Sequence, residues 1–67
     1  MEKLTMKALR VNAGLSQREV AKAIGITPGT LCRWERGQSA PPFDKVLALA
    51  ELYHCSADNF LMPINRA

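Results

Sequence analysis

With 67 residues, of which 48% are hydrophobic, the chain is long enough for one domain with a small core. Its net charge of +3 is typical of small nucleic-acid-binding domains, and of many other domains. Two cysteines are too few for a disulfide framework, no secretory signal is recognisable, and no apolar run approaches the ~20 residues of a membrane span. We therefore expect a cytoplasmic protein with reduced thiols and no membrane contact.

The first predicted helix extends from about Thr5 to Ala13. Met6, Leu9 and Ala13 lie on one face at helical spacing, and Gly14 ends the segment. Leu15 follows directly, as the apolar half of a hydrophobic staple for the next helix.

Two further helices are predicted, at residues 17–24 and 28–36. Ser16 and Glu19 have the spacing of a capping box, and Gly25 can adopt the left-handed conformation that ends a helix. Thr27 is a second N-cap, and Pro28 suits the first position of a helix. Two capped helices separated by so few residues match a helix-turn-helix, which places its second helix in the major groove of DNA.

Gly37 ends the third helix, and two more helices are predicted after it, at 43–53 and 56–61. The longer one carries apolar residues at the spacing of a buried stripe, namely Phe43, Val46, Leu47, Ala50 and Tyr53. Ser56 would cap the last helix and Pro63 would close it. No segment is predicted as a strand, so the expected fold is an all-α, compact five-helix bundle. We expect an N-terminal extension at residues 1–5, the domain at 6–62 and a short tail at 63–67.

The segment GLSQREVAKAIGITPGTLCRWERG, followed by LALAELYHCSADNFL, resembles the Cro/CI-type helix-turn-helix domain of phage repressors and xenobiotic-response-element-like bacterial regulators. The resemblance runs from about Met6 to Leu61, which is nearly the whole chain. It implies a five-helix DNA-binding domain that usually acts as a homodimer on an operator.

The resemblance also assigns roles by position. It implies that Arg10 and Glu35 form an ion pair between the first and third helices. It implies that Gln17 and the loop after the third helix contact DNA phosphates, and we add the neighbouring Arg18. The expected phosphate-contacting residues are therefore Gln17, Arg18, Arg36, Gly37, Gln38 and Ser39.

A helical wheel divides the third helix into two sides. Leu31 and Trp34 share one side with Thr30 and Glu35. The other side is available to a DNA groove; the alternative is that it is an ordinary solvent-exposed helix face. Wheel and resemblance together give the expected base-contacting residues as Thr27, Pro28, Gly29, Thr30, Cys32 and Arg33. Trp34 could stack on a base, but its place beside Leu31 favours packing at the core edge.

Arg33 is the principal candidate among these residues, because arginine can bond O6 and N7 of guanine together. Gly29 lacks a side chain and so permits close approach of the backbone. The chain departs from the family at Pro28 and Gly29, where relatives often carry polar side chains. The family contact between Gln17 and a polar residue at position 28 cannot form here.

A single short helix reads only a few base pairs, which is too little to select one operator in a genome. We therefore expect a homodimer on a palindromic site, with the C-terminal end of the domain as its interface. The residues expected there are Ala57, Asn59, Leu61, Met62 and Ile64, with the alternative that Leu61 and Ile64 merely close the core.

The expected function is sequence-specific binding of double-stranded DNA by a transcriptional repressor. The alternative is a protein-interaction module on the same fold, such as an antitoxin. No nucleophile–base pair, paired carboxylates or phosphate-cradling glycine loop indicates an enzyme. Cys32, His54 and Cys55 lack metal-ligand spacing, so no metal, cofactor or small-molecule ligand is expected.

Overall fold

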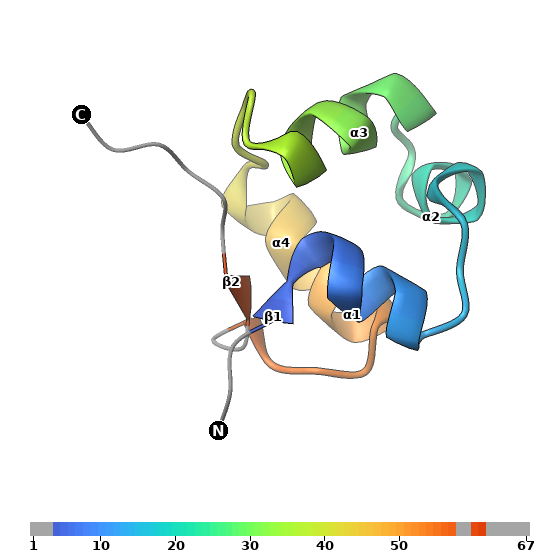
Figure 1. Cartoon of the computed structure of the whole chain (residues 1–67), viewed down its shortest axis with the longest axis vertical. Coiled ribbons are helices and arrows are strands. Elements are labelled where there is room, and N and C mark those ends of the chain that lie inside the picture. The colour runs from blue at the N-terminus through green and yellow to red at the C-terminus, as the bar shows by residue number, and fades with distance from the viewer. Residues whose placement is uncertain (1–3, 58–59, 62–67) are drawn as a thin grey trace.

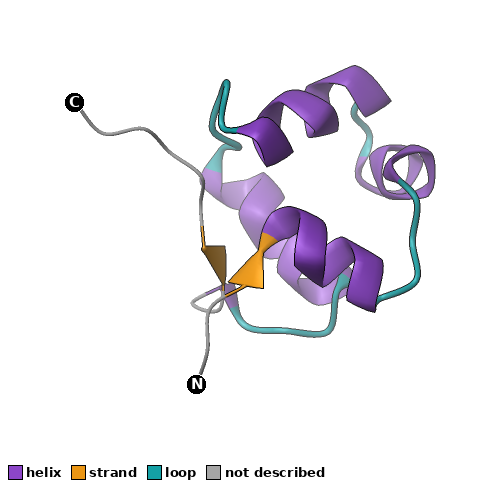
Figure 2. Cartoon of the chain, viewed as in Figure 1, coloured by secondary structure: helices purple, strands orange, loops and turns teal. Residues whose placement is uncertain are grey.

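The structure, a computed structural model, describes residues 4–57 and 60–61 (Figure 1). This part of the chain holds four helices and two short strands (Figure 2), in the order β1 (Leu4–Thr5), α1 (Met6–Asn12), α2 (Gln17–Ile24), α3 (Pro28–Arg36), α4 (Phe43–Leu52) and β2 (Phe60–Leu61). In Figure 1, α1 lies in front of α4, with α3 above them and α2 to the right. Within the described ranges, no helix has the length and apolar character needed to cross a membrane.

The predicted helix-turn-helix is confirmed, and its caps form as the sequence indicates. The backbone N–H of Glu19 donates to Ser16 Oγ at 3.0 Å, and the Ser16 N–H donates to Glu19 Oε1 at 2.8 Å. Gly25 ends α2 with a φ of 78°, a left-handed conformation that a residue with a side chain rarely adopts. Thr27 then caps α3 by accepting the N–H of Thr30 at 3.2 Å. These local bonds fix the sharp turn between the two helices.

The core lies where the four helices meet. Its largest fully buried side chains come one from each helix, and they are Met6, Val20, Leu31 and Leu49. Trp34 packs at the edge of this cluster with 6% of its surface exposed, which agrees with packing rather than stacking outward. Leu15 and Cys55 are partly buried against the same cluster. One side of α3 is therefore held firmly by the core.

The expectation of a fifth helix that reaches Phe60 and Leu61 is wrong, as is the expectation of no strand, while residues 58–59 of that predicted helix lie outside the described residues. Phe60 and Leu61 form β2, which pairs in parallel with Leu4 and Thr5 of β1. A segment of six residues closes too few helical hydrogen bonds to be stable alone. Phe60 instead buries its ring against Tyr53, with centroids 6.3 Å apart, while its backbone pairs with the start of the chain. The described residues thus contain four helices, and the two ends of the domain are joined.

The expected buried stripe of α4 is only partly buried. Phe43 and Leu47 are 71% and 48% exposed, whereas Leu49, Ala50 and the C-cap residue Tyr53 lie in the core. The helix is rotated so that Leu49 faces the centre of the domain, and this rotation carries Phe43 and Leu47 outward while Val46 stays half-buried against the core. The helix bounds also differ slightly from expectation, because Thr5 and Tyr53 act as caps of α1 and α4 rather than as helical residues.

Candidate nucleic-acid interface

The exposed side of α3 is the surface that the sequence assigns to base contacts. Leu31 and Trp34 turn into the core, whereas Pro28, Gly29 and Arg33 are exposed. Cys32 and Thr30 are half-buried at the two borders of this side. The arginine expected to meet bases is therefore exposed, on a helix whose opposite side packs into the core.

The first turn of α3 is held by the hydroxyl groups of two threonines. Thr27 Oγ1 and Thr30 Oγ1 lie 2.9 Å apart, in addition to the capping bond from the Thr30 N–H. A Cβ built on Gly29 would meet only Thr27 Oγ1, at 4.0 Å. The fold itself therefore leaves room for a side chain at position 29.

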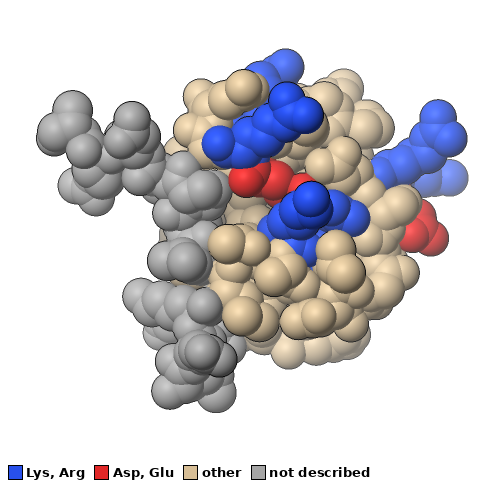
Figure 3. All heavy atoms as spheres, in the orientation of Figure 1, with Lys and Arg blue, Asp and Glu red and all other residues tan. Residues whose placement is uncertain are grey.

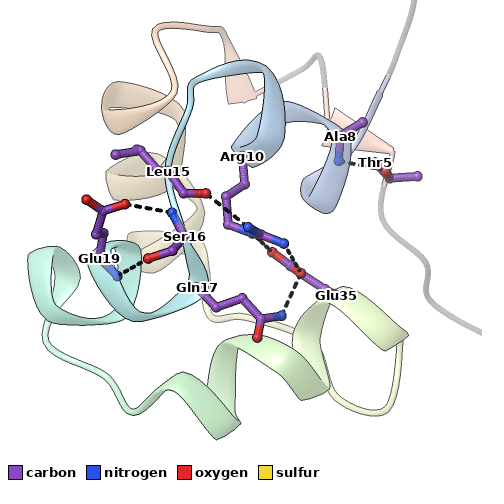
Figure 4. A network of polar contacts seen from close by, with 8 residues as sticks. All are labelled: Thr5, Ala8, Arg10, Leu15, Ser16, Gln17, Glu19 and Glu35. Carbon is purple, nitrogen blue, oxygen red and sulfur yellow. Dashed lines mark hydrogen bonds and ion pairs between the residues drawn. The ribbon is translucent and has the colours of Figure 1, made fainter.

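A network of polar side chains joins the first three helices (Figure 4). Arg10 Nε lies 2.8 Å from Glu35 Oε2, and Arg10 Nη2 donates to Glu35 Oε1 at 3.3 Å, so the arginine contacts both carboxylate oxygens. Arg10 Nη1 also donates to the carbonyl oxygen of Leu15 at 3.0 Å, at the start of the turn into α2. The Arg10 and Glu35 side chains are only 11% and 3% exposed. The hydrogen bond to Glu35 raises the pKa of Arg10 above its ordinary value.

Gln17 is the third member of this network. Its Nε2 donates to Glu35 Oε1 at 2.9 Å, so the side chain of the first residue of α2 is fixed to α3. Sequence reasoning assigned Gln17 to a phosphate and did not foresee this bond. The amide nitrogen carries two hydrogens, so one remains for another acceptor.

The loop after α3 uses its first two backbone donors internally. Gly37, with a φ of 79°, donates its N–H to the carbonyl of Trp34 at 3.1 Å, and Gln38 donates to Arg33 at 2.9 Å. These are the bonds of a left-handed helix cap. The exposed side chains of Gln38 and Ser39 are therefore the groups this loop offers most directly to a ligand.

A polar hollow of about 340 Å³ lies beside α3, between α1 and the start of α2. Its lining residues are Lys7, Arg10, Gln17, Cys32, Glu35 and Arg36. Figure 3 shows basic side chains over α1 and α3, with acidic atoms between them. Sequence reasoning counted Lys7, with Arg18, Lys22, Arg33 and Arg36, among the basic residues that face phosphates, but it gave Lys7 no contact of its own. The sequence feature that could have placed Lys7 here is its position one helical turn before Arg10 on α1.

Three of the five residues expected at a dimer interface cannot be placed in the fold. Asn59, Met62 and Ile64 lie outside the described residues. Ala57 is half-buried against the core, and Leu61 belongs to β2. The dimer interface thus stays a prediction.

Outside this interface, the described residues form one further hollow and no metal-binding cluster. A second hollow of about 330 Å³ lies between α2 and α4, lined by Ala23, Ile24, Ala48, Glu51, Leu52 and His54. Across the ranges 4–57 and 60–61, no three His, Cys, Asp or Glu side chains come together as a metal site. The described residues offer no clustered ligands from which to build a metal centre.

Comparisons with known proteins agree with this geometry. A helix-turn-helix family model matches residues 6–60. The chain is 36% identical over 56 residues to the HTH-type transcriptional regulator ImmR of Bacillus subtilis strain 168. That match covers 84% of this chain but only 44% of the relative, so the chain corresponds to less than half of that protein. No solved structure matches it. The chain belongs to the Cro/CI-type helix-turn-helix family, a family of DNA-binding transcription regulators.

Proposed function

We propose that this chain binds double-stranded DNA in a sequence-specific manner and regulates transcription by inserting α3 into the major groove. The observation that carries the proposal is the division of α3 into two sides. Leu31 and Trp34 anchor one side in the core, and the other side presents Arg33 to solvent beside the half-buried Cys32. A helix held in this way can enter a groove without reorganising the domain.

Arg33 is the residue to which we assign sequence reading, through guanine O6 and N7. Thr27, Pro28, Gly29, Thr30 and Cys32 would shape the fit around it. The backbone at Gly29 would come closest to the DNA, because no side chain intervenes there.

Phosphate contacts would hold α3 in register. We assign them to Gln17, Arg18, Arg36 and the loop from Gly37 to Ser39. Gln17 suits this role since Glu35 already orients its amide and one amide hydrogen remains. Because Gly37 and Gln38 use their N–H groups within the cap, we assign the loop's contacts chiefly to the side chains of Gln38 and Ser39.

We further propose that two copies act together on a palindromic operator and repress transcription by occupying it. Two copies related by a twofold axis double the number of base contacts, and their α3 helices would lie ~34 Å apart, in successive major grooves. Occupancy of a promoter is sufficient for repression, so this role requires no catalytic group.

Selection of bound duplexes from a random pool tests the proposal. We expect enrichment of one motif, repeated as inverted half-sites about one helical turn apart. Enrichment of a single unrepeated motif, bound by one protein per duplex, would remove the dimer from the proposal. Absence of any enriched motif would contradict sequence-specific binding itself.

A further inference from the structure

The polar hollow between α1, α2 and α3 has two rims that carry positive charge. Lys7 lies on α1 and Arg36 on α3, and both residues are exposed. Between them lie Arg10 and Glu35, which pair with each other, and Gln17, which donates to the same carboxylate. The hollow is thus formed by three different helices rather than by one flexible segment.

The charges in this hollow do not balance. Its three cations outnumber its single carboxylate, and Arg10 and Gln17 already satisfy that carboxylate through three hydrogen bonds. Among the described residues, Arg10–Glu35 is the one ion pair, so Lys7 and Arg36 line the hollow without a paired carboxylate. An anion entering here would meet positive potential and no exposed negative group in the lining.

The position of the hollow indicates which anion it would take. Cys32 and Arg36 lie one helical turn apart, at the border of the exposed side of α3, and both line the hollow. If α3 occupies the major groove, the sugar-phosphate strand on that flank must run past the start of α2 and α1. A phosphodiester of that strand is the anion that this geometry brings to Lys7.

We propose that Lys7 binds a DNA phosphodiester at this hollow, opposite Arg36, so that α1 belongs to the DNA interface. The inference rests on the proposed function, since it concerns the same docking geometry. Lys7 would act as a positioning residue: it would add affinity for every duplex and fix the register of α3, without reading sequence.

The salt dependence of binding tests this proposal directly. Each phosphate neutralised by a cationic side chain contributes about 0.9 to the slope of log affinity against log salt concentration. Removing Lys7 should lower the magnitude of that slope by about 0.9, so that between about 50 and about 200 mM salt the wild-type affinity falls roughly 3.5-fold more than that of Lys7→Ala. Lys7→Arg should keep the wild-type slope. Lys22→Ala, which removes an exposed lysine of α2 outside the hollow, should keep it too.

Neutral methylphosphonate linkages placed one at a time in the selected duplex identify the phosphate itself. Wild-type protein should lose affinity at one linkage on this flank, and Lys7→Ala should be insensitive to that same linkage. Thermal unfolding of Lys7→Ala should match wild type, because the side chain is exposed.

An unchanged salt slope in Lys7→Ala, or an equal reduction in Lys22→Ala, would overturn the assignment of Lys7 while wild-type binding still supports the proposed function. A wild-type protein that binds no duplex at any salt concentration would overturn both.

Discussion

Arg10 Nε lies 2.8 Å from Glu35 Oε2, and this contact ties α1 to α3 at a point where both side chains are almost fully buried. The same carboxylate accepts a hydrogen bond from Gln17 at the start of α2. Three helices are therefore fixed to one another through a single glutamate.

Breaking the pair from one side should be costly. Arg10→Met should lower the free energy of unfolding by roughly 3 kcal/mol, because it leaves the Glu35 carboxylate buried beside Gln17 alone. Chemical denaturation of Arg10→Met, Glu35→Gln and the double variant measures the coupling. Arg18→Met, at an exposed position of α2, is the matched control and should change stability little.

The double variant should be more stable than the sum of the two single losses predicts, because neither charge is then left unpaired. Strict additivity of the two losses would show that the contact does not couple α1 to α3.

Tyr53 should weaken the domain at high pH. Its hydroxyl is buried and has no hydrogen-bond partner among the described residues. Burial raises its pKa from 10.0 to about 12, with the Glu35 carboxylate adding to the effect. Since the folded-state pKa is raised, the contribution to stability is fully present below pH 10 and is lost as the pH rises towards 12.

Tyr53→Phe removes both the unpaired hydroxyl and its titration. At pH 7 the variant should be as stable as wild type or more stable by about 1 kcal/mol, since no hydrogen bond is lost. The free energy of unfolding of Tyr53→Phe should exceed that of wild type by a growing amount above pH 10. Denaturation of both proteins at pH 7 and at pH 11 checks this, and a Tyr53→Phe variant that is clearly less stable at pH 7 would show that the hydroxyl has a partner.

Substitution of Gly29 should affect the stability of the fold and the affinity for DNA in opposite directions. The fold leaves open space for a side chain here, and alanine is the better helix former by up to ~1 kcal/mol. Gly29→Ala should therefore keep or raise the melting temperature. It should nevertheless bind the selected duplex more weakly, by ~1–3 kcal/mol, because the added methyl group meets a closely packed surface. Equal affinity and equal sequence preference in the two proteins would mean that the backbone at position 29 stays away from DNA.

The helix-turn-helix could be predicted from the sequence because its signals are local. Ser16 with Glu19 and Thr27 with Pro28 each specify a helix start within a few residues, and Gly25 specifies the end between them. Neither the packing partners nor the rest of the chain is needed to interpret such signals.

The other features depend on contacts between distant parts of the chain. The pairing of Leu4 with Phe60 joins strands of two residues each, which are too short to show any periodicity. The apolar character of Phe43 marks a helix face but does not say whether another element covers it. The bond from Gln17 to Glu35 and the hollow beside Lys7 arise only once three helices have been placed.

The affinity of Arg33→Ala for the selected duplex and for its single base-pair variants tests the central claim most directly. If the exposed side of α3 reads bases in the major groove, this variant loses ~1–3 kcal/mol of binding free energy and its discrimination at one G·C pair, while other positions keep their preference. Arg18→Ala, the matched control, should weaken binding to all duplexes by one common factor. An Arg33→Ala protein with wild-type affinity and wild-type preference at every base pair would contradict the account.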